Sequence, residues 1–183
     1  MIVMARRVRT SKEKRMKPNF FVFCEGETEV AYVMHLRSKY RVPIQIIPKK
    51  SDSNISCRYI ENCKKCYELT DRDQTFLMYD LDVAGVLEQL NCISGTILLV
   101  SNPCIELWFL LHCVDVSAEQ NQNDCVKKYK KISTQYSKGK LGIVDINIFV
   151  AGEENAIQRA KKLNSPNNPS TTLYKLIEAI REI

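Results

Sequence analysis

The sequence predicts an α/β domain with a central, mostly parallel four-stranded sheet flanked by helices and followed by further helices. Three observations lead to this prediction. Strand and helix patterns alternate through the first hundred residues, which is typical of parallel strands joined by right-handed crossovers. The expected central strands are near-continuous apolar runs, as buried parallel strands are. Two of these runs stop at acidic residues, and ligands of such sheets bind beyond the carboxyl ends of the strands.

The first strand–helix–strand unit is expected within the first fifty residues. The run Phe-Phe-Val-Phe-Cys at 20–24 forms the first strand. A helix follows near 28–40, with apolar residues on one face and basic residues at its end, where they suit the helix dipole. The apolar stretch 44–47, closed by Pro48, forms the second strand.

A second unit repeats this order. Ile60, Cys63 and Tyr67 mark the apolar stripe of a helix near 55–69. The third strand is the apolar run 75–81. A short helix near 83–90 and a strand at 96–100, opened by Gly95, complete the expected sheet.

The remaining elements are predicted to be helical. Pro103 suits the first turn of a mostly apolar helix from Cys104 to Cys113. Further helices are expected near 124–133 and 153–163. Ser170 is expected to be the N-cap of a last helix at 171–182, after a turn-rich break.

The chain divides into a basic arm and one domain. Residues 1–18 form the arm, and residues 19–183 form the domain, with its core at 19–114 and a helical part at 115–183. The chain has 183 residues and a net charge of +6, much of it in the arm. Arg6, Arg7 and Arg9 of the arm are candidates to contact nucleic-acid phosphates. A solvated tail that aids solubility is the alternative.

Composition favours a cytoplasmic location. No apolar run approaches the roughly 18 residues of a membrane span, and no apolar segment follows the charged N-terminus as in a secretory signal. We therefore expect no membrane partner and read the eight cysteines as free thiols. Cys63 and Cys66 have metal-ligand spacing but lack a second pair at a matching distance.

Two expected strands deliver carboxylates to the same edge of the sheet. Asp80 and Asp82 end the third strand and, two residues apart, point to the same side. Paired carboxylates are costly without a cation, so Mg²⁺ or Mn²⁺ is the natural cofactor. Glu25 follows the first strand, and Gly26 allows the sharp turn that presents it. Glu27 and Glu29 are read as acids that favour a helix start.

These motifs resemble known families. Glu25-Gly26 together with Asp80-x-Asp82 resembles the Toprim domain of topoisomerases, primases and OLD-type nucleases. With two further motifs, Ser101-Asn-Pro-Cys-Ile-Glu-Leu-Trp-Phe-Leu-Leu-His112 and Asn168-Pro-Ser-Thr-Thr-Leu-Tyr-Lys175, the chain resembles the RloB/AbiLii family from residue 20 onward. The resemblance implies a bacterial Toprim-type nuclease in phage defence or abortive infection, often paired with an ATPase encoded nearby. The family's usual arginine between the aspartates is Leu81 here, so a phosphate role at that position is in doubt.

The resemblance and the local sequence suggest further roles. Glu25 matches the Toprim glutamate, which is a general acid/base or a metal ligand. Glu106, a lone acid on an apolar helix, needs a metal or a basic partner. Lys138 is a candidate phosphate ligand or an exposed basic residue. Asn102 caps the helix that follows or contacts substrate, and Ser170 caps the last helix or helps to bind an anion there.

Three functions remain open from the sequence. The leading one is a metal-dependent nuclease that hydrolyses phosphodiester bonds of DNA or RNA. The second is a haloacid-dehalogenase-like phosphatase, in which Asp80 would be the nucleophile, although that motif normally follows the first strand. The third is a non-catalytic module that binds nucleic acid or nucleotides. The sequence leaves open whether the chain forms a homo-oligomer.

Overall fold

The structure, a computed structural model, describes residues 17–48 and 55–183. Arg6, Arg7 and Arg9 lie outside the described residues, so their contact with phosphates stays a prediction. Within the described part of the chain, no helix is long and apolar enough to cross a membrane.

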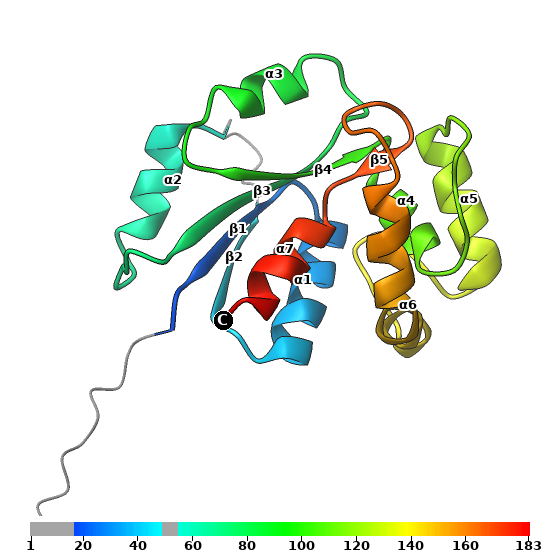
Figure 1. The fold of residues 1–183 in the computed structure, drawn as a ribbon, viewed down its shortest axis with the longest axis horizontal. Helices are drawn as coiled ribbons and strands as arrows, with labels where there is room; N and C mark the ends of the chain where they lie inside the picture. The colour runs from blue at the N-terminus through cyan, green and yellow to red at the C-terminus, as the bar shows by residue number, and fades with distance from the viewer. Residues whose placement is uncertain (1–16, 49–54) are drawn as a thin grey trace, which may run out of the picture.

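The α/β prediction is confirmed, with one strand more than expected. The sheet has five strands in the order β2-β1-β3-β4-β5, and the first four of this order are parallel (Figure 1). β3 therefore lies at the centre. The strands are β1 (Phe20–Cys24), β2 (Ile44–Pro48), β3 (Gln74–Asp80), β4 (Ile97–Asn102) and β5 (Ser170–Thr171).

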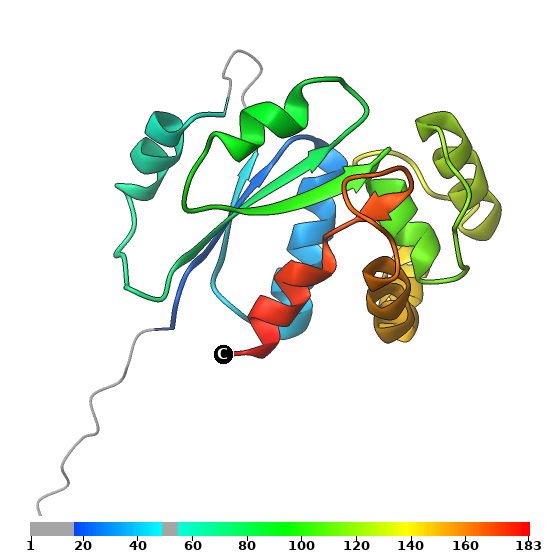
Figure 2. The same ribbon diagram turned by 45° about the horizontal axis from the view of Figure 1, so that its top comes forward.

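Seven helices are found among the described residues. They are α1 (Glu27–Tyr40), α2 (Cys57–Lys64), α3 (Val86–Asn91), α4 (Ile105–Leu111), α5 (Gln122–Ile132), α6 (Ile143–Lys161) and α7 (Tyr174–Arg181). Figures 1 and 2 show α2 and α3 on one face of the sheet and α1 and α7 on the other, with α4, α5 and α6 beside them.

The sheet separates two apolar cores, as period-2 alternation requires. Phe20 and Val22 of β1 face the larger core, which α1, α4, α6 and α7 complete. Phe21 and Phe23 face the smaller core under α2 and α3. Burial on both faces explains why these strands are continuous apolar runs.

The C-terminal strand corrects the role expected of Ser170. Ser170 is not a helix N-cap but lies in β5, which pairs antiparallel with β4, and the N-cap of α7 is Leu173. Hydroxyl groups hold β5 in place. The hydroxyls of Ser101 and Thr171 are 2.9 Å apart, and Thr172 Oγ1 accepts a hydrogen bond of 2.9 Å from the Val100 N–H group.

Several helix boundaries also differ from the prediction, among them the starts of α3 at Val86 and of α7 at Tyr174 in place of 83 and 171. α2 ends at Lys64, short of the expected 69, and α6 begins at Ile143 and not near 153. The first half of α6 is apolar on most sides, so it lacks the amphipathic period that marks a helix. The start of α4 is also shifted: Cys104 is its N-cap, so Pro103 precedes the helix instead of occupying its first turn.

Helix α4 is the centre of the C-terminal half. All of its residues from Ile105 to Leu111 are buried. It is enclosed by the sheet, α5 and α6, and the ring centroids of Phe109 and Phe149 are 4.8 Å apart. Because α4 starts just after the end of β4, it carries Glu106 toward the carboxyl edge of the sheet.

Candidate metal centre

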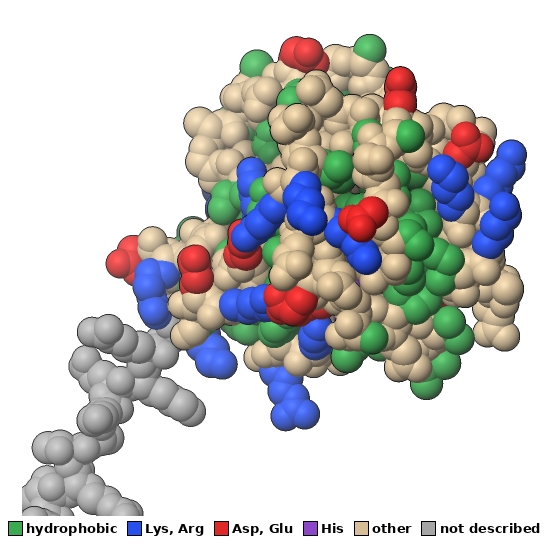
Figure 3. All heavy atoms as spheres, turned by 45° about the vertical axis from the view of Figure 1, so that its right-hand side comes forward, with side chains coloured by type: hydrophobic (Ala, Val, Ile, Leu, Met, Phe, Trp, Pro, Cys, Tyr) green, Lys and Arg blue, Asp and Glu red, His purple; other side chains and the backbone are tan. Residues whose placement is uncertain are grey.

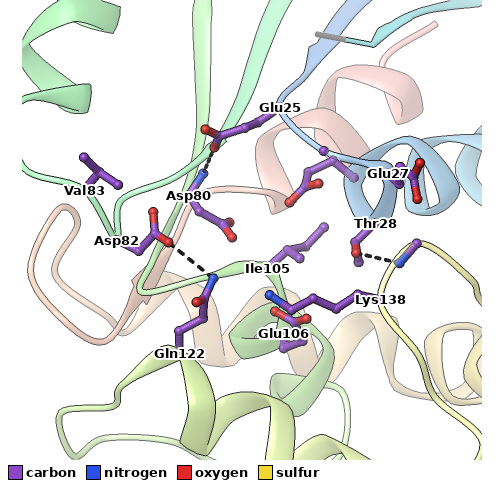
Figure 4. Close-up of a pocket in the computed structure, with 13 residues that line it drawn as sticks. Glu25, Glu27, Thr28, Asp80, Asp82, Val83, Ile105, Glu106, Gln122 and Lys138 are labelled. Atoms are coloured by element: carbon purple, nitrogen blue, oxygen red, sulfur yellow. Dashed lines mark hydrogen bonds between the residues drawn. The ribbon is translucent and has the colours of Figure 1, made fainter. Parts of the chain in front are cut away.

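A pocket of about 430 Å³ lies at the carboxyl edge of the sheet, where β1 and β3 end and α1 and α4 begin (Figure 4). Its wall contains more acidic side chains than any other type. The acids are Glu25, Glu27, Glu29, Asp80, Asp82 and Glu106, and Lys138 is the one cationic side chain among the described residues of this wall.

Asp80 is the centre of this acidic cluster. It is the last residue of the central strand β3, so most of its surface is covered. Burial raises the pKa of Asp80 to about 9, and the charges of Glu29, Glu106, Glu25 and Asp82 add to this rise. At neutral pH without a cation, Asp80 is therefore protonated.

Asp82 lines the same pocket but is exposed. Its Oδ2 accepts a hydrogen bond of 3.3 Å from Gln122 Nε2 of α5 (Figure 4). Within the described ranges, no three His, Cys, Asp or Glu side chains form a group that could hold a metal ion in this conformation. The acids converge on one pocket, and side-chain rotation would be needed to close them around an ion.

Glu25 is held directly above Asp80. Its Oε2 accepts a hydrogen bond of 3.1 Å from the backbone N–H of Asp80, which ties the end of β1 to the end of β3. Gly26, the next residue, is the N-cap of α1. A Cβ atom at Gly26 would lie 2.9 Å from Glu29 Oε2, so this glycine leaves room for the carboxylate of Glu29.

Glu29 is a pocket residue that the sequence reasoning missed. It was read as an acid at the helix start, yet it is only 5% exposed and lines the pocket. Burial raises its pKa, and the charges of Glu25 and Glu106 act in the same direction. No helical spacing marks Glu29 as a pocket residue, because Glu25 lies before Gly26, the N-cap of α1. Glu27, by contrast, is exposed.

Glu106 is the most deeply buried acid of the pocket. It is 1% exposed, and Tyr136 donates a hydrogen bond of 2.8 Å to its Oε1. Its Oε2 is buried and has no hydrogen-bond partner among the described residues. An unpartnered buried carboxylate oxygen is costly, and a cation in the pocket would satisfy it. The donor set therefore fits a hard divalent cation, which prefers carboxylate oxygens.

Lys138 reaches the pocket from the loop between α5 and α6. Gly139, with φ of +78°, donates its N–H to Thr28 Oγ1 of α1 at 2.9 Å. A Cβ at Gly139 would lie 2.7 Å from Glu27 Oε2, so glycine permits this close approach of loop and helix. Figure 4 shows the Lys138 ammonium group pointing into the space that Glu106 faces.

The two remaining predicted residues do not line this pocket. Asn102 donates a hydrogen bond of 2.8 Å to the Pro166 carbonyl and does not cap α4, whose N-cap is Cys104. Ser170 is fully buried in β5, and no helix starts at it. Its predicted contact with an anion at a helix N-terminus has no counterpart in this fold.

The fold and the pocket define an α/β protein with an acidic site at the carboxyl edge of its sheet. The family model described as RloB-like protein matches residues 20–180. The chain therefore belongs to the RloB-like family, as its four motifs indicate. No curated protein and no solved structure matches the chain.

Proposed function

We propose that this chain is a divalent-metal-dependent nuclease that hydrolyses phosphodiester bonds of DNA or RNA. The observation that best supports the proposal is the crowding of carboxylates around Asp80, whose pKa is raised to about 9 by burial and further by these neighbouring charges. A cluster of acids that lacks compensating cations costs stability, and a bound metal ion removes that cost. Clusters of this kind are more common at functional sites than elsewhere.

The proposed ligands are the acids at the sheet edge. Asp80, Asp82, Glu25 and Glu106, joined by Glu29, would hold Mg²⁺ or Mn²⁺. Such an ion, when bound, polarises the scissile phosphate and lowers the pKa of a coordinated water. Mg²⁺ is usually held by one or two carboxylates together with several waters, so five acids would supply enough ligands for more than one ion.

The protein itself would supply orientation and charge. The Asp80 N–H donates a hydrogen bond to Glu25, and in the proposed reaction the Glu25 carboxylate would accept a proton from an attacking water. Tyr136 orients Glu106 in the same manner. Lys138 is exposed at the pocket, where its ammonium group would bind a phosphate oxygen and stabilise the charge that develops in the transition state.

The biological setting is proposed from the family resemblance alone. We propose that the chain is the effector of a bacterial anti-phage or abortive-infection system, that it acts in the cytoplasm and that an ATPase encoded nearby is its partner. An ATPase gene beside the gene for this chain would support this setting. Cleavage that requires the ATPase and ATP would support it more directly.

A phosphatase of the haloacid-dehalogenase type is the less suitable enzyme. Its aspartate motif normally follows the first strand, whereas Asp80 ends the third strand of the chain, β3. A phosphatase of this type also gives no role to Glu25, which follows β1. A non-catalytic module that binds nucleic acid is the other alternative, and it would need the same metal without turnover.

The test uses the full chain, alone and with the neighbouring ATPase, on labelled DNA and RNA with Mg²⁺, Mn²⁺ or a chelator. We expect metal-dependent cleavage that is absent in the Asp80→Asn variant. A small phosphate ester is assayed in parallel, and its hydrolysis would favour the phosphatase. If neither nucleic acid nor the small ester is hydrolysed under any condition, only the non-catalytic module remains.

A further inference from the structure

The outer face of α6 is an apolar surface without a partner in the described structure. In the first ten residues of α6, Ile143–Gly152, the only charged residue is Asp145, and it is buried. It accepts hydrogen bonds of 2.8 Å from Tyr129 OH and from the Gly142 N–H. The exposed side of this helix half therefore has no charge.

This face contains large β-branched residues that a solvated helix normally avoids. Ile143 is 75% exposed, Val150 is 54% exposed and Val144 is 42% exposed. Asn147 lies between them and is also exposed. A helix that is apolar on all sides is normally buried on all sides. Figure 3 shows hydrophobic side chains gathered over the side of the molecule where α4, α5 and α6 lie.

The charges at the two ends of this face are of opposite sign. Lys140 is exposed just before the helix, and Glu154, which also forms an ion pair with Arg181 of α7, is exposed just after the apolar half. Glu154 lies seven residues after Asn147 and therefore on the same face of α6, whereas Lys140 lies seven residues before Asn147, in the loop that leads into the helix. Two copies of α6 that cross antiparallel at Asn147 would place each Lys140 near Glu154 of the other copy. A parallel crossing would instead pair like charges.

We propose that this face binds a second copy of the chain through an antiparallel, two-fold α6–α6′ interface centred on Asn147. In this arrangement Val144 of each copy packs against Val150 of the other, and Ile143 packs against Ala151. A two-fold interface must be complementary to itself, and this face meets that requirement in both its apolar and its charged residues. The inference is independent of the proposed nuclease activity.

The apolar part is tested with Val150→Asp. The substitution buries two unpaired carboxylates in the interface, one for each copy, and should raise the dimer dissociation constant at least about tenfold. Leu69→Asp is the matched control, since Leu69 is 56% exposed and lies between α2 and β3, at the other end of the sheet. Sedimentation velocity of the full chain, from low to high micromolar protein, measures the dissociation constants. Circular dichroism checks that each variant is folded.

The orientation is tested by charge exchange. Lys140→Glu and Glu154→Lys should each weaken the dimer, and the double variant should restore it, because the exchanged charges again face unlike partners. The proposal is overturned if the wild type stays monomeric at high micromolar concentration, or if Val150→Asp leaves the dimer intact. It is also overturned if the double variant is as weak as the two single variants.

Discussion

Two clusters of buried carboxylates in this molecule have opposite electrostatic surroundings. Glu153 of α6 is 6% exposed and lies 2.5 Å from Lys39 Nζ and 2.6 Å from Arg181 Nη2, and Tyr40 also donates a hydrogen bond to it. Burial alone would raise the pKa of Glu153, but these donors outweigh burial and lower it. Asp80, in the pocket, has acids as its charged neighbours, and its pKa rises to about 9.

The difference separates a structural cluster from the cluster that we propose to be a metal site. The Glu153 cluster joins α1, α6 and α7, and each charge there is paired within the protein. The Asp80 cluster violates the rule that buried charges are paired. Such violations are expected at functional sites, where the missing partner is a ligand. The following predictions test this contrast.

The largest expected effect is loss of cleavage without loss of stability. Asp80→Asn and Glu25→Gln remove the charge that holds a cation or moves a proton, and should each cost on the order of several kcal/mol in the activation barrier. Their melting temperatures should equal or exceed that of the wild type without metal. Wild-type-like cleavage by both variants would locate the activity, if present, elsewhere.

The paired cluster should respond in the opposite way. Glu153→Gln keeps the size of the side chain but leaves Lys39 without its carboxylate and Arg181 with Glu154 alone, and should lower the free energy of unfolding by about 1–3 kcal/mol. Cleavage by the folded variant should stay normal. Urea unfolding and an activity assay below the transition together test this, and Glu88→Gln, at an exposed glutamate of α3, is the control.

The third prediction concerns the pH dependence of stability without metal. The pKa of Asp80 is about 9 in the folded protein and about 3.8 in its ordinary, solvated state. Between these two pH values, the folded protein therefore binds the Asp80 proton more tightly than the unfolded chain does. The free energy of unfolding should therefore fall as pH rises from about 4 toward 9. At pH 8, Asp80→Asn should stabilise the metal-free chain by at least about 1.4 kcal/mol, the equivalent of one pKa unit. Glu153 contributes to the pH dependence of stability with the opposite sign. Its pKa is lowered in the folded protein, so the stability that it provides is lost as pH falls.

A smaller effect is expected from Lys138, the cation of the pocket wall. Lys138→Ala should weaken substrate binding and slow cleavage by less than the loss of Asp80, because the side chain is exposed and acts through a screened charge. Lys127→Ala, an exposed lysine of α5, is the control. Equal kinetics for the two variants would remove Lys138 from the proposed site.

The sequence predicted the elements whose signals are local. The strands β1 to β4 are apolar runs, Asp80 ends β3 and Glu25 follows β1. These patterns were enough to predict the fold class and the edge of the sheet where the pocket lies. β5 has only two residues, Ser170 and Thr171, and is held by hydroxyl contacts to β4 that leave no periodic pattern.

The missed features depend on contacts between distant residues. The pairing of Glu153 with Lys39 spans 114 positions, and the bond from Tyr136 to Glu106 joins a loop to a buried helix. Glu29 has the ordinary sequence context of an acid at a helix start, and only its burial distinguishes it from Glu27. Sequence patterns specify which face of an element is covered but not which polar partner covers it.

The central claim is that a divalent cation compensates the acids around Asp80. The most direct test is a calorimetric titration of the full chain with Mn²⁺ at pH 7, repeated in buffers of different ionisation enthalpy to count the protons released. We predict binding that releases about one proton, since Asp80 is protonated before the ion binds. Asp80→Asn should weaken binding and abolish the release. Absence of binding by the wild type, or identical titrations for wild type and Asp80→Asn, would contradict the account.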